Sequence, residues 1–228
     1  MKLSVKEVTR IFAVSENEVA RWVREQNLPA MMVAGQLRFH GSDLLEWAAS
    51  RKMSVPPELF CNGNFDGPFG LLRAALTRGG LLPNVPGADK ESVLSAVVER
   101  LPFLSSAERQ ELATLLKTRE KGGTTAVGDG IAIPHPAHPL VVAGSEPSIT
   151  LCYLNQAVDF GAGDHLPVHA IFLLLATNIR NHLTLLAELA SALHNQQVRE
   201  AIKNHAGQPA FMRVIDRLCE ESVEVSRP

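Results

Sequence analysis

The residues from Gly128 to His135 are the strongest candidate for chemistry in this chain. They read Gly-Asp-Gly-Ile-Ala-Ile-Pro-His, so a glycine-rich turn leads into a short apolar strand that a proline ends. Pro134 and Pro136 flank His135 and restrict the backbone on both of its sides. Neutral imidazole is a good nucleophile near pH 7 and can be phosphorylated reversibly. His135 is therefore suited to accept a phosphoryl group and pass it on.

A phosphorylated histidine needs groups that stabilise its charged oxygens. Arg119 stands at the expected end of a helix before the glycine-rich turn, and its guanidinium matches phosphate geometry. His182 opens another expected helix, where backbone N–H groups and positive potential favour an anion. Thr125 offers a hydroxyl donor. The spacing of these residues does not by itself bring them together.

The surrounding sequence must position these groups, and it alternates helical and extended patterns. Apolar residues at helical spacing predict helices, and two apolar, partly β-branched runs predict buried strands. We expect an α/β unit over residues 67–228, with a mixed sheet flanked by helices. The predicted helices cover 68–78, 89–101, 105–119, 182–193, 196–204 and 208–221, and the predicted strands cover 131–133, 149–154 and 168–175.

Over about residues 68–221 this pattern resembles the fructose/mannitol-type IIA domains of the bacterial sugar phosphotransferase system, which include the nitrogen-regulatory IIA proteins. The resemblance rests on a spaced set of residues. They are Arg119-Glu120, Thr125, the run from Gly128 to His135, His182-Leu183 and Leu185-Leu186-Ala187, with Val158-Asp159-Phe160 and Pro167-Val168 in support. The intervals of 16 residues from Arg119 to His135 and 47 from His135 to His182 also agree.

The resemblance implies that His135 is phosphorylated and that Arg119 and His182 support the phosphoryl group. Asp129 stands where the family has an acidic or amide residue, which implies a secondary role in orienting a neighbour. Two departures stand out. Gly122-Gly123-Thr124 predicts a looser loop after the arginine, and Thr177 replaces a proline of many relatives.

Residues 1–52 predict a separate small unit. Ser4 to Glu7 and Ser15 to Glu18 both have the pattern of a capping box, so two short helices begin there. Residues 31–39 predict a hairpin, and a third helix follows Ser42-Asp43. Two helices with a tight turn and then a hairpin favour a winged helix-turn-helix domain.

This N-terminal unit resembles the excisionase-like helix-turn-helix family. The resemblance rests on a run of matching positions: Val5 to Val8, Val14-Ser15, Val19 to Val23, Leu28 to Ala30, Arg38-Phe39, Asp43-Leu44 and Trp47. It implies contacts with double-stranded DNA through Asn17, Arg21, Arg24, Gln36 and Arg38. The unit has 8 basic and 6 acidic residues, with no dense basic patch, so a protein-contact module is the alternative.

Proline pairs and Asn-Gly steps over residues 53–66 predict a linker between the two units. The whole chain of 228 residues has a formal net charge of -2, which indicates no strong field for nucleic acid or membrane. Three widely spaced cysteines predict neither a disulfide framework nor a zinc site. No signal peptide or membrane span is predicted, so we expect a cytoplasmic protein.

Other site chemistries are less well supported. His165 and His169 have the spacing of helical zinc ligands, but Pro167 between them favours an extended segment, so no metal is predicted. The chain lacks a Walker phosphate loop and a Gly-x-Ser-x-Gly elbow, so neither nucleotide use nor serine catalysis is expected. We expect no cofactor, and the phosphoryl donor should be another protein.

Three functional hypotheses follow. The first is a regulatory phosphocarrier, phosphorylated on His135 by an upstream histidine phosphocarrier protein and linked to DNA through the N-terminal unit. It acts as a carrier with transferase-type chemistry rather than as a stand-alone enzyme. The second is a transport-type IIA component that passes phosphate to a IIB domain of a sugar permease. The third is a binding module with a vestigial carrier site. The lack of a sugar-transport segment favours the first.

Overall fold

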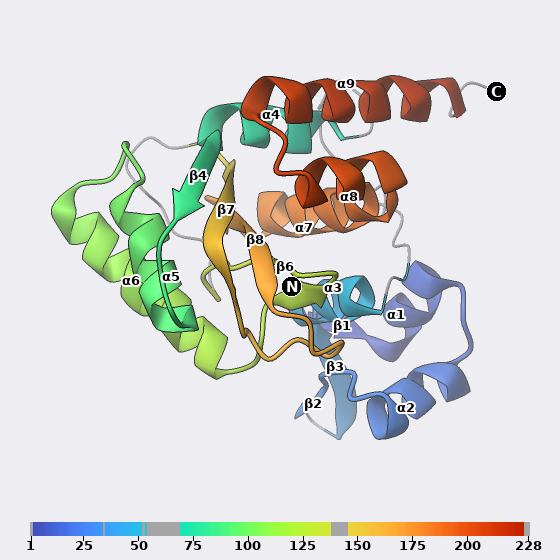
Figure 1. Ribbon diagram of the computed structural model, residues 1–228. Coiled ribbons are helices and arrows are strands. Elements are labelled where there is room, and N and C mark those ends of the chain that lie inside the picture. Colours follow the sequence, from blue (N-terminus) through green and yellow to red (C-terminus); the bar gives the residue numbers. More distant parts are fainter. Residues whose placement is uncertain (1, 34, 52, 54–68, 138–145, 226–228) are drawn as a thin grey trace.

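The computed structural model describes residues 2–33, 35–51, 53, 69–137 and 146–225 (Figure 1). The predicted linker over 53–66 lies outside these residues, apart from Met53. No helix among the described residues is long and apolar enough to cross a membrane.

The N-terminal unit is a winged helix-turn-helix fold. Its strands form an antiparallel sheet in the order β1-β3-β2, in which Leu3 pairs with Phe39. The first strand was not predicted, because three residues before a helix cap show no periodicity. The elements are β1 (Lys2–Ser4), α1 (Val5–Phe12), α2 (Glu16–Glu25), β2 (Met31–Val33), β3 (Gln36–His40) and α3 (Gly41–Ser50).

Local capping and aromatic packing explain these helices. Ser4 and Glu7 form the predicted capping box at α1. At α2 the side chain of Ser15 accepts from the Glu18 N–H, but the Glu18 carboxylate bonds Arg21 and Trp22 instead of returning to Ser15. The predicted second capping box is therefore only half formed. The rings of Trp22 and Trp47 lie 5.0 Å apart and anchor α3 to α2.

The larger unit is an α/β sandwich around one five-stranded sheet, in the order β4-β7-β8-β6-β5. Strands β4 with β7 and β6 with β8 are parallel, while the other two pairs are antiparallel, which confirms the predicted mixed sheet. Two strands, β4 and β5, were not predicted. The strands are β4 (Leu81–Val85), β5 (Ala126–Gly128), β6 (Ile131–Ala132), β7 (Ser148–Val158) and β8 (Val168–Leu175).

Helices cover both faces of this sheet (Figure 1). The helices α5 and α6 pack on one face, and α4, α7, α8 and α9 pack on the other. Alternate residues of β7 serve the two cores: Leu151 and Tyr153 face one, and Cys152 and Leu154 face the other. The helices are α4 (Gly70–Gly79), α5 (Lys90–Glu99), α6 (Ser106–Lys121), α7 (Ile179–His194), α8 (Gln196–Lys203) and α9 (Gln208–Val225).

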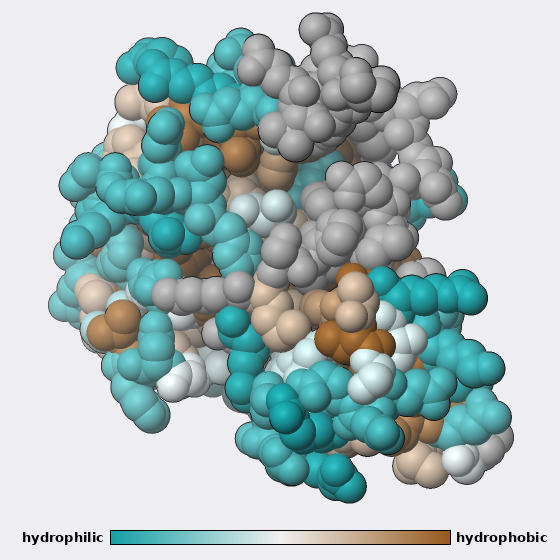
Figure 2. All heavy atoms as spheres, turned by 90° about the vertical axis from the view of Figure 1, so that its right-hand side faces the viewer, coloured by the Kyte–Doolittle hydropathy of each residue, from teal (hydrophilic) through white to brown (hydrophobic). Residues whose placement is uncertain are grey.

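The two units share one hydrophobic cluster. Helix α3 packs against α7 and against strand β5, and the buried residues of the N-terminal unit belong to the same cluster as those under α4 and α7. Figure 2 views the molecule from the side of α1 and α2 and shows mostly hydrophilic residues over the lower lobe, which the N-terminal unit forms. Most apolar residues of this unit are therefore buried, some in its own core and some against the larger unit.

Candidate functional site

Hydrogen bonds on both sides hold the segment that leads to His135. The Ile133 N–H donates to the Thr125 carbonyl at 3.0 Å, and the Leu174 N–H of β8 donates to the Pro134 carbonyl at 3.0 Å. Pairing with β8 thus continues past the end of β6, because a proline still accepts although it cannot donate. His135 follows at once, so its backbone is anchored to the sheet.

The ring of His135 is fixed in one tautomer by a backbone carbonyl. Its Nδ1 lies 2.7 Å from the Ile133 carbonyl oxygen. Because a carbonyl only accepts, Nδ1 carries the proton and donates it. The lone pair of the neutral ring is then on Nε2, so Nε2 is the nucleophilic nitrogen of this tautomer.

His182 lies beside His135. Asn178 caps α7, since its side chain accepts from the Asn181 N–H at 2.8 Å, and His182 follows in the first turns of this helix. The two histidine rings have centroids 4.9 Å apart and an angle of 66° between their planes. The structure therefore brings together a strand-end histidine and a helix N-terminus that are 47 residues apart in the sequence.

A buried carboxylate holds Thr125. The hydroxyl of Thr125 donates to Glu120 at 2.6 Å, and its N–H donates to the same carboxylate at 3.1 Å. Lys90 lies 3.3 Å from Glu120 and also donates to the Phe160 carbonyl. Since the hydroxyl proton of Thr125 is given to Glu120, this residue positions the strand before His135 in this conformation. The amino-acid sequence indicated no role for Glu120 or Lys90, and the charged pair Arg119-Glu120 was the only signal.

Arg119 lies on the last turn of α6, directly before Glu120. Its Nη1 donates to the Gly123 carbonyl at 3.1 Å. The Thr124 hydroxyl donates to the Phe160 carbonyl at 2.6 Å. The glycine-rich loop that was predicted to be loose is therefore held at both ends by side chains.

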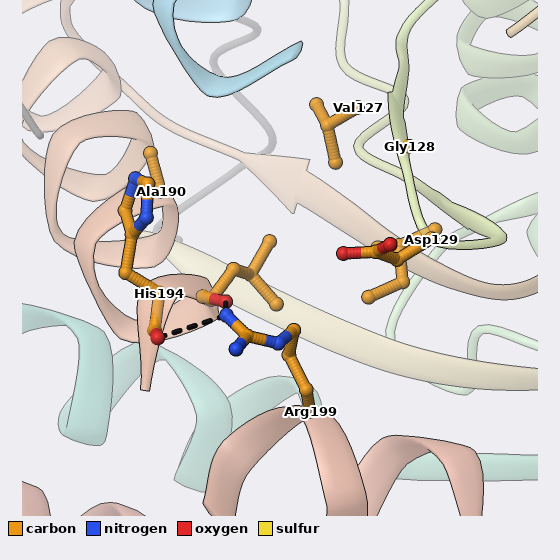
Figure 3. A pocket seen from close by; sticks show the side chains of 8 residues that line it. Val127, Gly128, Asp129, Ala190, His194 and Arg199 are labelled. Carbon is orange, nitrogen blue, oxygen red and sulfur yellow. Dashed lines mark hydrogen bonds between the residues drawn. The ribbon is translucent and has the colours of Figure 1, made fainter. Parts of the chain in front are cut away.

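Asp129 lies apart from the two histidines. It occupies the turn between β5 and β6 with a φ of 53°, and its N–H donates to Asp164 at 2.8 Å. Figure 3 shows Asp129 across a small pocket from His194 and Arg199, at the end of α7 away from His182. At about 1.5 Å per residue, His182 and His194 are roughly 18 Å apart along this helix. Asp129 and the histidine pair thus lie at different ends of α7.

The candidate DNA contacts lie on two elements of the N-terminal unit, and Arg38 among them is half-buried. Asn17, Arg21 and Arg24 are exposed on α2, and Gln36 and Arg38 lie on β3 of the wing. Arg21 pairs with Glu18 at 2.6 Å, and Arg38 donates to the Gln36 side chain at 2.7 Å. Helix α2 carries three glutamates and two arginines, so the positive field at this surface is weak.

The two histidines weighed as metal ligands lie in different settings. His165 is in the loop before β8, with a φ of 58°, and His169 is on β8. The ring of His169 stacks on His205 at 5.6 Å, and His205 stacks on Tyr153 at 4.5 Å. Burial and the neighbouring His205 lower the pKa of His169. Across the part of the chain that is described, no three His, Cys, Asp or Glu side chains gather to hold a metal.

A mixed sheet with a strand-end histidine packed against a helix-start histidine defines a IIA-type domain, here preceded by a helix-turn-helix domain. The family described as "Phosphoenolpyruvate-dependent sugar phosphotransferase system, EIIA 2" matches residues 77–218, and "Helix-turn-helix domain" matches residues 3–52. The chain belongs to this EIIA 2 family and carries an additional N-terminal helix-turn-helix domain.

Similar proteins include regulators and transport components. A nitrogen regulatory protein of Pseudomonas aeruginosa is 33% identical over 148 residues, which cover 63% of this chain and 94% of that protein. The fructose-specific EIIABC component of Bacillus subtilis is 28% identical over 145 residues, 62% of this chain and 22% of that protein. The crystal structure of nitrogen regulatory protein IIA-Ntr from Neisseria meningitidis matches with a TM-score of 0.53 and 27% identity, covering 64% of this chain and 99% of that one. Both predicted resemblances are therefore confirmed.

Proposed function

We propose that this protein is a regulatory phosphocarrier that is phosphorylated on Nε2 of His135. The observation that carries the proposal is the hydrogen bond from Nδ1 to the Ile133 carbonyl, which leaves the lone pair on Nε2, with the His182 ring 4.9 Å from the His135 ring. We also propose functional units over residues 1–52 and 67–228, joined by a linker over 53–66.

The transfer step follows from this tautomer. The Nε2 lone pair attacks the phosphorus of a phosphohistidine on the donor protein, whose N–P bond breaks as the Nε2–P bond forms. A donor ring protonated on its other nitrogen leaves as neutral imidazole. The phosphorylated His135 ring keeps its Nδ1 proton and takes over the positive charge, which the Ile133 carbonyl stabilises.

The phosphoryl oxygens need positive partners at Nε2. His182 is near enough to donate to them, and the start of α7 adds its positive potential. Arg119 lies in the last turn of α6, on the segment that leads to Thr125. We propose that its guanidinium also donates to the phosphoryl oxygens. Glu120 and Lys90 support the site indirectly, because Glu120 accepts from Thr125 and Lys90 pairs with Glu120.

Replacing His135 by alanine tests this function. With phosphoenolpyruvate, the general phosphotransferase enzyme and an upstream histidine phosphocarrier protein, we expect the wild-type chain to gain the mass of one phosphoryl group. His135→Ala should gain none, and the control His165→Ala, on an exposed loop, should behave like wild type. If a competent upstream system phosphorylates neither the wild type nor the control, the carrier site is vestigial and the proposal fails.

We assign a regulatory output because nitrogen regulatory proteins are among the relatives and because a helix-turn-helix domain is attached. We propose that this domain contacts double-stranded DNA through α2 and the β2–β3 wing.

The similarity to a fructose-specific EIIABC component supports a second candidate, a IIA component that passes phosphate to a IIB domain. Transfer from phosphorylated chain to a IIB domain and on to sugar would favour this candidate. Failure with every IIB domain of the same cell would remove it.

A further inference from the structure

The face of the larger unit beside the two histidines is already occupied by the N-terminal unit. Helix α3 packs against α7 and β5, and Gly41 at its start touches Leu183. A Cβ added at Gly41 would lie 3.1 Å from Cδ2 and 3.2 Å from Cδ1 of Leu183. Leu45 and Ala48 follow Gly41 at helical spacing and are buried, so one apolar face of α3 is turned to this contact.

The two elements under α3 each adjoin a residue of the candidate site in the sequence. Leu183 directly follows His182 on α7. Strand β5 directly follows Thr125 and pairs with β6, the strand that leads to His135. His135 is only 1% exposed, and its Nε2 atom is shielded from solvent. This burial of the nucleophile is found in the conformation in which α3 packs on α7 and β5.

A covered Nε2 cannot take part in transfer between proteins. The phosphorus must come within about 3–3.5 Å of the attacking nitrogen and in line with the bond that breaks. The donor is a protein, so its surface must approach the walls of the site from outside. Interfaces between units of one chain are commonly small enough for the units to separate. Docked α3 and a productive donor thus compete for one face.

We propose that the N-terminal unit is a built-in competitor of the phosphoryl donor: α3 docks on α7 and β5 beside His135 and must leave before Nε2 can be phosphorylated. This inference rests on the proposed function of His135. By linkage, a phosphoryl group that needs the open state also favours that state, so phosphorylation releases the N-terminal unit. The exposed residues of α2 are outside the contact with Leu183, so docking leaves the proposed DNA-contact residues accessible.

A reversible disulfide between α3 and α7 tests the competition in the full chain. The Cβ built at Gly41 lies 3.8 Å from Cγ of Leu183, a position that the sulfur of a cysteine takes over, so Gly41→Cys with Leu183→Cys can close a bridge. The two single variants are the controls for the native cysteines. Phosphorylation by the donor protein is followed by mass for the oxidised and the reduced double variant.

We expect the oxidised double variant to be phosphorylated about tenfold more slowly or worse, because the fraction of open molecules limits the rate. Reduction should restore the rate, and the single variants should not respond to the reductant. Equal rates for a verified bridge and its reduced form would overturn the inference while leaving the proposed function intact. Failure of the bridge to form would overturn the docked arrangement. Absence of phosphorylation in every form, while the bridge still forms, would instead count against the carrier function.

A negative charge at the contact between α3 and Leu183 tests whether weaker docking speeds phosphorylation. Gly41→Glu puts a carboxylate against Leu183, and burying it there is unfavourable, whereas glutamate in the first turn of a helix suits α3 itself. Ala30→Glu, at an exposed position of the same unit, is the matched control. We expect faster phosphorylation of Gly41→Glu and an unchanged rate for Ala30→Glu. A rate for Gly41→Glu equal to or below that of wild type would contradict the competition.

Discussion

The reactive nitrogen of His135 is selected by a single backbone carbonyl, that of Ile133 two residues earlier. The carboxylate of Glu120 similarly fixes Thr125, because it accepts hydrogen bonds from both the hydroxyl and the N–H of Thr125. In both cases a buried polar group has a partner on its own segment. The orientation of the His135 ring and the position of Thr125 are therefore fixed before any phosphoryl group arrives.

Glu188 is a second buried carboxyl group, and its ionisation is coupled to the stability of the fold. Its Oε2 accepts from the Leu72 N–H at 2.7 Å, and burial raises its pKa to about 7. The unfolded chain loses this proton near the ordinary value of 4.5, whereas the folded protein keeps it until about 7. Stability therefore falls as pH rises through this window and stays lower above it.

Replacing Glu188 by glutamine should remove this pH dependence. The amide keeps an acceptor for the Leu72 N–H and never ionises. Relative to wild type, we expect Glu188→Gln to gain up to about 3 kcal/mol of unfolding free energy between pH 4.5 and pH 8. Denaturant unfolding at the two pH values measures the gain. Glu220→Gln, at an exposed position, should show no such change, and an equal response of both variants would refute the assignment.

Helix α2 has the position of a DNA-reading helix in a winged helix-turn-helix domain, but it carries no excess of positive charge. Its cap, its packing on Trp47 and its place before the wing agree with a reading helix. Its arginines are matched by glutamates, and Arg21 is held by Glu18. DNA contact would have to break this ion pair, which costs little at an exposed position.

Removing the two arginines of α2 should weaken retention on double-stranded DNA. We expect the full chain with Arg21→Ala and Arg24→Ala to elute from immobilised genomic fragments at lower salt than wild type. The dependence of binding on log salt should fall by about one for each arginine that contacts a phosphate. Arg10→Ala, on the exposed side of α1, is the control. Retention that ignores both α2 changes would rule out α2 as the reading helix.

The two units share one hydrophobic cluster, which runs through α3 into α7. Each unit also has aromatic or aliphatic packing of its own, such as Trp22 on Trp47 in the N-terminal unit. A shared contact between two self-contained cores is the arrangement that permits docking and release.

Thermal unfolding should report this coupling. The chain has two tryptophans, Trp22 and Trp47, both in the N-terminal unit, whereas most helical signal comes from the larger unit. We expect fluorescence and circular dichroism to give one common transition for wild type. In Gly41→Glu the fluorescence transition should move to lower temperature while the dichroism transition stays. Separate transitions already present in wild type, or in the control Ala30→Glu, would contradict docking in solution.

The amino-acid sequence by itself determined the classes of both units and most of their helices. Capping patterns, apolar periodicity and the motif that ends at His135 are local, so they can be read without coordinates. Short strands such as β1, β4 and β5 were not predicted because their few residues carry little pattern. Strands β1 and β4 are also stabilised by pairing with segments far along the chain.

Only the tertiary structure decided which groups meet. It brought the rings of His135 and His182 together, put Asp129 at the far end of α7, and joined Glu120 and Lys90 behind Thr125. It also packed α3 on α7 and β5, through a contact between Gly41 and Leu183 that no spacing rule predicts. The reason is that such contacts depend on how whole elements pack, and packing depends on shape and burial across the complete fold rather than on local sequence.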